Sequence, residues 1–535
     1  MRPEITRRSL VSSQDAPQPA LSPAGQGRPQ PFTTLLLAGT AAWVILWFIH
    51  TLGYWEDDAW IHLEFARSLA RGHGFSFNGH IVYGDTSPLW VWLLDAFHLV
   101  IPSWIAAGKT LAGVGCLFAL AGIFLFAEAL TRDLGRIRSR LFAAVTLLVL
   151  VVNPYFGYWA FSGMEALTAS GLVCWGLLSA ACDPLTAPIP PRRFILACLC
   201  AGLAPLLRPE MGFFTILLGL VLFVRWVNLP AVPRAKLTLF FGGFALVAGP
   251  GIAWALYAVR TFGSVLPTTN AAKRAAPQDS VLKHLLGIYA FGFPLVLIGL
   301  LLLLVWLTYT RKRSGPGIEA LLESLPVGGW LLFVWTAVNS LFYVVDHTYV
   351  QTRYIFVTAP LLTLVLLALA FRWHPRLFLA GTVFGGALGV FVSLLATWPL
   401  ITNKIGVDRE YAQLASFLHS LPPNAPVAHY SIGEAAFLSE HPIIDLGGIT
   451  RPGVIPFLFD PTDARLVWWM HEQGARFAVY SHSPEPGSTL VWQQDIPATG
   501  WFLDPRRYRN TERLEVWKLP AVPTIPLPAD MPTCR

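Results

Sequence analysis

The chain has 535 residues, of which 54% are hydrophobic and only 13% are charged. About a quarter of the residues of an ordinary soluble protein are charged, so this composition excludes that class. The formal net charge of +7 comes from arginines and lysines scattered over short loops, which excludes a continuous basic surface for nucleic acid. We therefore predict an integral membrane protein that has the lipid bilayer, and no nucleic acid, as a partner.

The first 30 residues are rich in proline, serine, glutamine and arginine, so residues 1–32 are predicted to form a disordered cytoplasmic tail. Apolar blocks of about 20 residues then recur, each long enough to cross a bilayer as a helix. The predicted spans are 33–54, 104–130, 141–161, 166–182, 194–207, 211–226, 237–258, 285–309, 327–345, 354–371 and 377–399. Residues 33–400 are thus predicted to form a polytopic α-helical membrane domain with about 11 transmembrane helices.

The loops between these spans alternate in charge. One set carries compact basic clusters, which the positive-inside rule places in the cytoplasm together with the N-terminus. These clusters are Arg132, Arg136, Arg138 and Arg140; Arg192 and Arg193; Arg225, Arg234 and Lys236; Arg311, Lys312 and Arg313; and Arg372 and Arg376. The other set carries mixed charge and is predicted to face outward.

Two segments depart from simple alternation. The short spans 194–207 and 211–226 are predicted to form a tight hairpin with residues 208–210 at its tip, because both outer ends of the pair are basic. Residues 87–103 are rich in tryptophan, and counting them as a span would invert every later one. We therefore predict an amphipathic helix on the outer membrane surface, within a first outer loop that covers 55–103.

After residue 400 polar and charged residues occur throughout the chain. Residues 408–420 and 463–473 have helical patterns, whereas 426–430 and 476–480 have the patterns of strands. Residues 401–535 are thus predicted to form a small extracytoplasmic α/β domain.

Three consecutive carboxylates, Glu56, Asp57 and Asp58, stand where the first span ends. A helical pattern begins at Asp57, so the acids could simply cap that helix, since a helix N-terminus favours negative charge. Three acids exceed what capping needs, which favours a functional site.

Several sequence segments resemble the GT-C superfamily of membrane glycosyltransferases, and the likeness extends over residues 40–450. It begins with DDAWIHLEFARSLARGHGFSFN at 57–78 and GDTSPLW at 84–90. It continues with SGMEA at 162–166, RPE at 208–210, GSVLPTTNAAK at 263–273, TRYIFVTAPLL at 352–362 and PIIDLGGIT at 442–450. Within the superfamily, the sequence looks most like the bacterial terminal β-(1→2) arabinofuranosyltransferases of cell-wall assembly and their uncharacterised relatives.

The resemblance implies a multi-pass protein of the bacterial inner (plasma) membrane that uses a polyprenyl-phosphate sugar donor. It implies transfer, with inversion, of a sugar such as arabinofuranose to a cell-envelope glycan or glycolipid on the outer face. A catalytic aspartate is expected in the first outer loop, where Asp57 and Asp58 match the acidic pair. The alternative interpretations are a transporter or flippase of a lipid-linked solute and a non-catalytic assembly partner.

Such a transfer needs a carboxylate to accept the acceptor's proton and cations to stabilise the leaving phosphate. Asp57 or Asp58 is the predicted base, with Asp58 favoured because it lies further into the loop. The predicted substrate-binding residues are Glu56, Glu165, Arg208, Glu210, Lys273 and Arg353. Arg208 and Arg353 are favoured for phosphate, since arginine binds it in bidentate fashion.

Each candidate also has a structural interpretation. Glu165 could cap a span, Arg208 could pair only with Glu210, and Lys273 could belong to a solvated loop. Whether a divalent cation takes part stays open, because paired acids can bind one or act alone.

Overall fold

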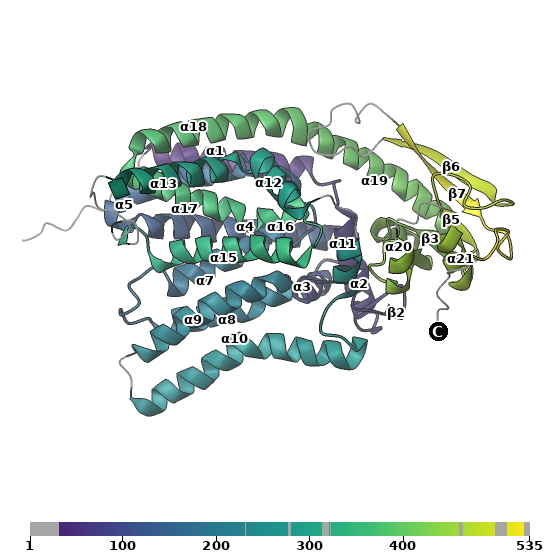
Figure 1. The fold of residues 1–535 in the computed structure, drawn as a ribbon, viewed down its shortest axis with the longest axis horizontal. Coiled ribbons are helices and arrows are strands. Elements are labelled where there is room, and N and C mark those ends of the chain that lie inside the picture. Colours follow the sequence, from purple (N-terminus) through teal and green to yellow (C-terminus); the bar gives the residue numbers. More distant parts are fainter. Residues whose placement is uncertain are drawn as a thin grey trace, which may run out of the picture.

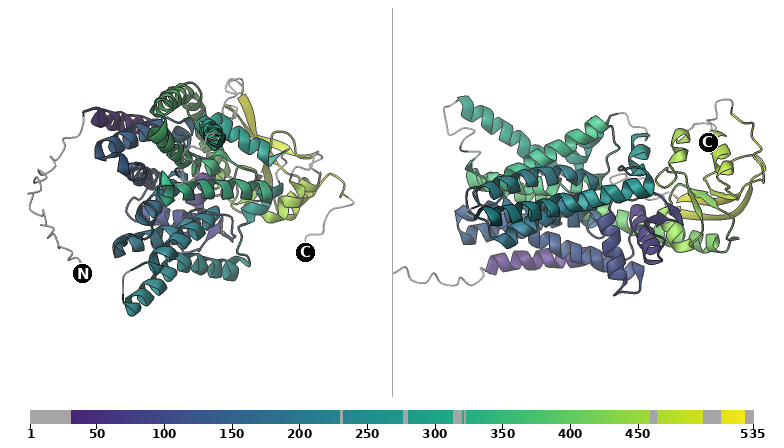
Figure 2. Two further views of the ribbon diagram at one scale, coloured as in Figure 1. Left: turned by 60° about the vertical axis from the view of Figure 1, so that its left-hand side comes forward. Right: turned by 90° about the horizontal axis from the view of Figure 1, so that it is seen from below.

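The computed structural model describes residues 31–229, 232–275, 280–312, 320, 323–458, 464–497 and 511–528. A bundle of long helices lies side by side, and a small sheet domain is attached at one end of it (Figure 1). Two further views show the same arrangement (Figure 2). Most of the predicted tail, residues 1–30, lies outside the described residues.

Each predicted span corresponds to a helix or a helix pair. These helices are α1 (Pro31–His50), α4 (Trp104–Leu130), α5 (Arg136–Val151), α7 (Ala166–Ala180), α8 (Pro191–Leu207), α9 (Gly212–Val227), α10 (Pro233–Phe262), α12 (Val281–Gly292) with α13 (Pro294–Lys312), α15 (Val327–Asp346), α17 (Ala359–Trp373) and α18 (Pro375–Val392). Among the described residues, seven helices are long and apolar enough to cross a membrane, or eight when one bent pair counts as a span. Because α5, α7 and α8 have only 15 to 17 residues, the number of eleven crossings stays a prediction.

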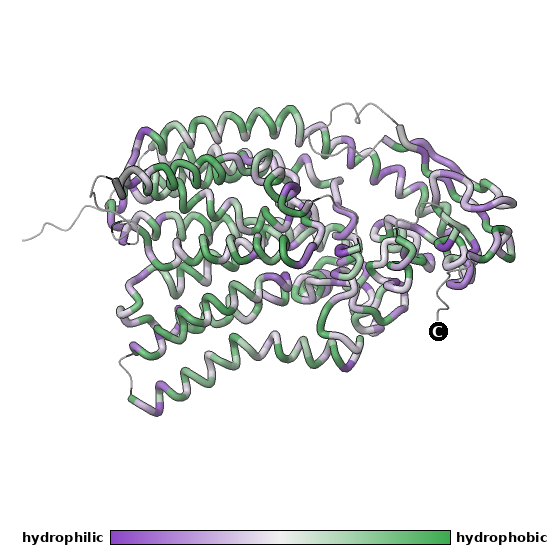
Figure 3. Tube along the Cα trace, in the orientation of Figure 1, coloured by the Kyte–Doolittle hydropathy of each residue, from purple (hydrophilic) through white to green (hydrophobic). Residues whose placement is uncertain are grey.

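The helices of the bundle are largely apolar along their length (Figure 3). On α10, for example, Leu237 and Phe241 are exposed, and on α13 and α18 so are Leu301 and Val383. Exposed apolar side chains of this density suit a lipid environment rather than water. The predicted polytopic α-helical fold with a small C-terminal α/β domain is confirmed.

The span predicted at 285–309 is not one straight helix. α12 and α13 meet at an angle of 100° around Phe293. Pro294 lacks the backbone N–H that would continue the first helix, so the chain turns there. Likewise, Pro154 starts the separate short helix α6 (Pro154–Trp159) inside the span predicted at 141–161.

The predicted cytoplasmic loops lie together at the end of the bundle away from the sheet domain (Figure 1). Asp183, in the loop between α7 and α8, pairs with Arg132 at 2.9 Å and with Arg193 at 2.7 Å. Arg372 pairs with Asp133 across the same end. This grouping agrees with the alternation of loop charge along the chain.

The first outer loop folds against the opposite end. It contains α2 (Asp57–Ala70), the short strands β1 (Ser76–Phe77) and β2 (His80–Ile81), and α3 (Pro88–His98). α3 is the helix predicted within 87–103. The hairpin predicted around 208–210 is also present, since the short 3₁₀ helix Pro209–Met211 joins α8 to α9.

The C-terminal domain is connected to the bundle by a continuous helix. α18 passes through a short π-helical turn into α19 (Trp398–His419), so the helix predicted at 408–420 is the end of α19 and crosses the predicted boundary at residue 400. The sheet has the order β4-β3-β5-β7-β6. Its strands are β3 (Val427–His429), β4 (Ile443–Asp445), β5 (Phe477–Val479), β6 (Thr489–Pro497) and β7 (Thr511–Lys518).

β3, β4 and β5 are parallel, and the β6–β7 hairpin extends the sheet in antiparallel fashion. α20 (Gly433–Ser439) connects β3 to β4, and α21 (Ala464–Glu472) lies between β4 and β5 in the chain. Helix α20 packs against α2 of the first loop. The domain is therefore in contact with the segment that carries the three acids.

Candidate active site

The three acids of the first loop stand at the start of a helix that is enclosed on nearly all sides. Glu56 has an extended backbone and precedes the first turn of α2, which contains Asp57 and Asp58. Residues Ala59 to Ser68 of α2 are all buried. Because successive helical residues point about 100° apart, the three carboxylates face three different neighbours.

Glu56 and Asp57 face the elements that connect the bundle to the C-terminal domain. The Glu56 carboxylate accepts hydrogen bonds from Tyr54 at 2.9 Å and Tyr158 at 3.2 Å, and lies 3.2 Å from the Lys404 amine of α19. Asp57 accepts a 3.3 Å hydrogen bond from the backbone N–H of Glu434 in α20. Both acids thus fix the first loop to its surroundings.

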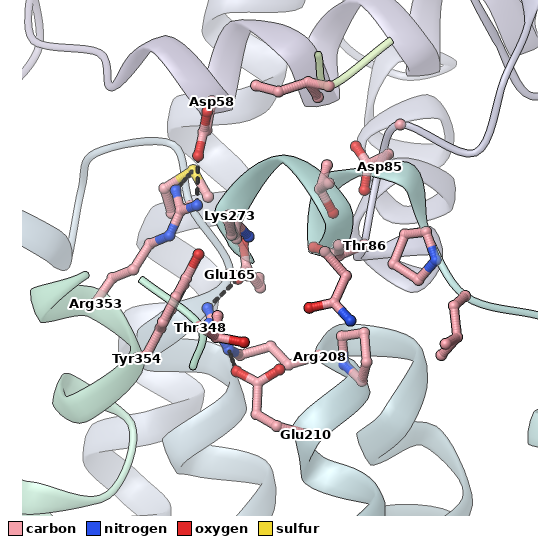
Figure 4. Close-up of a pocket in the computed structure, with 18 of the residues that line it drawn as sticks. Asp58, Asp85, Thr86, Glu165, Arg208, Glu210, Lys273, Thr348, Arg353 and Tyr354 are labelled. Carbon is pink, nitrogen blue, oxygen red and sulfur yellow. Dashed lines mark hydrogen bonds and ion pairs between the residues drawn. The ribbon is translucent and has the colours of Figure 1, made fainter. Parts of the chain in front are cut away.

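Asp58 instead faces a cavity of about 290 Å³ (Figure 4). Six of the eight predicted site residues line it: Asp58, Glu165, Arg208, Glu210, Lys273 and Arg353. These residues come from α2, the start of α7, the hairpin tip, α11 (Thr268–Ala275) and α16 (Thr352–Phe356). The structure therefore brings together residues spread over almost 300 positions of the sequence, and it places Glu56 and Asp57 outside the lining.

Buried ion pairs occupy one side of the cavity. Arg208 donates to Glu165 at 2.6 Å and to Glu210 at 2.7 Å. His62 lies 2.5 Å from Asp85 and 3.3 Å from Glu165. Charges buried to this degree are stable only when paired, and the chain of contacts satisfies that condition. Arg208 therefore pairs with Glu210, as its structural interpretation expects, and also with Glu165.

The other side of the cavity is built around Tyr354. The guanidinium groups of Arg208 and Arg353 lie 4.8 and 5.3 Å from the centre of its ring, and the Lys273 amine lies at 5.1 Å. Arg353 also donates a hydrogen bond to the Asp58 carboxylate. Among the described residues, no carboxylate lies within ion-pair distance of Lys273. This amine is thus the cation of the site that is not neutralised by a carboxylate.

The electrostatic surroundings give the two aspartates different properties. Burial and the neighbouring Asp58 raise the pKa of Asp57 to about 6. Burial also acts to raise the pKa of Asp58, but Arg353 and Lys273 outweigh it, and the net effect lowers that pKa. Asp58 is therefore an ionised acceptor at neutral pH, whereas Asp57 is half-protonated only near pH 6 and is mostly ionised at pH 7.

The His62 side chain is charged for a similar reason. Burial opposes the charge on His62, but Asp85 and Glu165 raise its pKa to about 10. Burial likewise disfavours ionised Glu165, yet His62 and Arg208 lower its pKa to about 2. The imidazolium therefore holds Glu165 and Asp85 in place at any physiological pH.

Sequence reasoning missed three residues of the cavity: His62, Asp85 and Tyr354. The separation of 23 residues between His62 and Asp85 gives no periodic signal, and Tyr354 sits in an apolar run. All three fall inside segments that carry the family resemblance, which is the signal that could have found them. Arg274, next to Lys273, pairs instead with Asp346 outside the cavity lining.

A divalent cation does not fit the donor set as arranged. The carboxylates lining the cavity each face a cationic side chain already. In the part of the chain that the structure describes, no group of three or more histidine, cysteine, aspartate or glutamate side chains is placed to hold a metal ion.

No protein-family model matches the chain, and no curated protein matches its sequence. Solved structures do match its fold. ArnT from Cupriavidus metallidurans bound to undecaprenyl phosphate aligns with a TM-score of 0.50 at 14% identity, over 91% of this chain and 98% of ArnT. Apo ArnT gives 0.52 at the same identity and coverage.

The apo oligosaccharyltransferase of Archaeoglobus fulgidus aligns with a TM-score of 0.50 at 12% identity, over 84% of this chain and 69% of that protein. Both proteins are no more than 14% identical to this chain, so the alignments show a shared fold. The chain therefore shares its fold with ArnT and with this oligosaccharyltransferase, which agrees with the GT-C-like fold that the segments of its sequence predict.

Proposed function

We propose that this protein is a membrane glycosyltransferase that moves a sugar from a polyprenyl-phosphate donor to a hydroxyl group of a cell-envelope glycan or glycolipid. The observation that carries the proposal is the cavity in which an ionised carboxylate, Asp58, and an unneutralised cation, Lys273, face the same space. The undecaprenyl phosphate bound to ArnT, a protein of the same fold, supports this class of donor.

Donor binding follows from the two chemical faces of the cavity. Lys273 and Arg353 are cationic and lie 5.1 and 5.3 Å from the centre of the Tyr354 ring, where they can hold the phosphate. Phe213, Leu266 and Phe342 also line the cavity and are apolar. Such a wall suits the first isoprene units of the lipid, which then continue into the bilayer.

Asp58 is the proposed general base. The acceptor oxygen attacks the anomeric carbon while the bond from that carbon to the phosphate oxygen breaks. The acceptor proton passes to the Asp58 carboxylate, and the bonding electron pair leaves with the phosphate, which the cations stabilise. Attack from the face opposite the phosphate inverts the anomeric carbon.

Arg353 links donor binding to this step. In the free protein its guanidinium is hydrogen-bonded to Asp58, which makes that carboxylate a weak base. A donor phosphate attracts the same guanidinium. Arg353 then shares its hydrogen bonds with the phosphate, and the pKa of Asp58 rises toward a value better suited to proton transfer. The base is thus strengthened only when the donor is bound.

The sugar that the sequence resemblance favours is arabinofuranose, and the proposed location is the outer face of a bacterial inner membrane with the N-terminus in the cytoplasm. The transport alternative expects charges midway along the spans. The charged cavity instead lies at the end of the bundle beside the C-terminal domain, which favours the enzyme (Figure 1).

The test uses the full chain in liposomes with radiolabelled polyprenyl-phosphoryl arabinofuranose and a cell-envelope acceptor extract. Asp58→Asn removes the proton acceptor, so transfer should fall by a factor of about 10² to 10⁴ while donor binding persists. Asp133→Asn, at the other end of the bundle, is the control and should keep the wild-type rate. Absence of transfer by the wild type with this and other polyprenyl-phosphate sugars, or full activity of Asp58→Asn, would contradict the proposal.

A further inference from the structure

The parallel strands of the C-terminal domain have a topology that forms ligand-binding sites in other α/β sheets. Its central strand β3 is flanked by β4 on one side and β5 on the other, and all three are parallel. The chain leaves β3 for β4 and then crosses back over β3 to reach β5. In open α/β sheets, ligands bind outside the carboxyl ends of the strands where the direction of winding reverses in this way. Here that place lies at the carboxyl ends of β3 and β5.

A cluster of three aromatic side chains occupies this place. Tyr430 follows β3 and Tyr480 follows β5, and their ring centres lie 6.2 Å apart. His482 packs edge-on against Tyr480 at 5.0 Å. Tyr480 is buried and supports the group, whereas 45% of the Tyr430 surface is exposed. In the described part of residues 401–535, Tyr430 is the only phenylalanine, tyrosine or tryptophan that is exposed.

The same edge of the sheet adjoins the active-site cavity. Ser431, directly after Tyr430, donates a side-chain hydrogen bond to Asp57. The loop after β4 brings Ile449 into the cavity lining. In that loop, Gly447 is so close to the Tyr430 backbone that an added Cβ would lie 3.6 Å from its carbonyl oxygen. The exposed tyrosine therefore stands beside the loops that enclose Asp58.

We propose that Tyr430, supported by Tyr480 and His482, forms an acceptor subsite that stacks against a sugar ring of the glycan receiving the new residue. A tyrosine offers a rigid apolar face with few rotamers, which suits the C–H face of a sugar, and its hydroxyl adds a polar contact. This inference rests on the proposed function, because it assigns the acceptor of that reaction to a carbohydrate.

Saturation-transfer NMR on the full-length protein in nanodiscs tests the subsite without any donor. The probes are methyl α-D-arabinofuranoside and methyl α-D-mannopyranoside at millimolar concentration. Loss of one stacking contact weakens binding about tenfold, so Tyr430→Ala should abolish the ring-proton signals. Tyr430→Trp should restore them. Leu490→Ala, a half-exposed apolar residue on the distant edge strand β6, should leave them unchanged.

Absence of any glycoside signal in the wild type, or equal signals in Tyr430→Ala, would overturn the subsite. The transfer assay separates this from failure of the proposed function. If the wild type uses the donor but Tyr430→Ala keeps the acceptor KM, only the subsite is wrong. If glycoside binding depends on Tyr430 but no polyprenyl-phosphate sugar is used, the subsite stands as a carbohydrate site and the proposed reaction is wrong.

Discussion

The two ends of the helical bundle use arginine–carboxylate pairs under opposite conditions. At the end with the predicted cytoplasmic loops, Arg132 is 61% exposed and pairs with Asp183, which is itself partly exposed. At the cavity end, Arg208 and its partner Glu165 are 6% and 2% exposed. Water screens the exposed pair Arg132–Asp183. The buried pair Arg208–Glu165 has lost its hydration and is stabilised only by its protein partners.

The difference shows that the buried pair at the cavity end gives up hydration that the exposed pair keeps. Surface pairs contribute about 0–1 kcal/mol and are easily replaced. Buried pairs often contribute no more than apolar residues of the same size, so stability alone does not explain them. A connected set of buried charges beside an apolar wall is what a charged substrate with a lipid tail requires. The comparison therefore supports the proposed site at the cavity end.

The largest effect on stability should come from removing the shared arginine of the cavity. Arg208→Ala leaves Glu165 and Glu210 buried without their common partner, which we expect to lower the free energy of unfolding by about 3–5 kcal/mol. Arg132→Ala at the opposite end should cost less than about 1 kcal/mol. Thermal unfolding of both variants in the same detergent measures the difference, and equal losses would remove the contrast between the two ends.

The next effect concerns adjacent residues of α11. Lys273→Ala removes the cation that no described carboxylate neutralises, and a charge-assisted contact contributes about 1.5–3 kcal/mol. The donor KM should therefore rise roughly 10- to 100-fold. Arg274→Ala is the matched control, since Arg274 pairs with Asp346 outside the cavity lining and should leave the donor KM unchanged. If both variants have the wild-type donor KM, the phosphate is held elsewhere.

Local patterns in the sequence predicted the helices well, because hydropathy and loop charge are properties of short segments. Asp58 also followed from a local feature, the acidic start of α2. The partners of Asp58 did not, because Arg353 is 295 residues away and reaches it only through packing of the bundle. The same holds for His62 and Asp85, whose pairing depends on how the first loop folds back. The β6–β7 hairpin was missed since its two strands lack a strong apolar alternation.

A smaller effect concerns Arg353, which we propose both holds the donor phosphate and lowers the pKa of Asp58. Arg353→Gln removes the main charge that lowers the pKa of Asp58, while Lys273 and His62 still face it. The pKa of Asp58 should then rise, so the acid limb of the kcat/KM profile should move to higher pH by on the order of one unit. Arg274→Gln should not move it. A limb that stays in place in Arg353→Gln would show that Asp58 is not the group that titrates.

The last prediction concerns Glu434, an acid near the cavity end that has no counter-ion among the described residues. Glu434 of α20 is buried, and no described cation lies within ion-pair distance of it. Burial, together with Asp408 and Asp57, raises its pKa. A raised pKa in the folded state means that folding retains a proton which the unfolded chain releases. Stability from this group is thus present at low pH and is lost as the pH rises from the unfolded value of Glu434 toward its folded one.

Glu434→Gln removes this titration, so its Tm should fall less than that of the wild type between pH 5 and pH 8. The wild type should lose about 1.4 kcal/mol for each pH unit between the unfolded and the folded pKa of Glu434, a loss that the variant lacks. Glu440→Gln, at the residue directly after the same helix, is the control, because its carboxylate is half-exposed and pairs with Arg67 and Arg71. Equal pH dependence of Tm in wild type and Glu434→Gln would show that the contact between α20 and the first loop holds no buried proton.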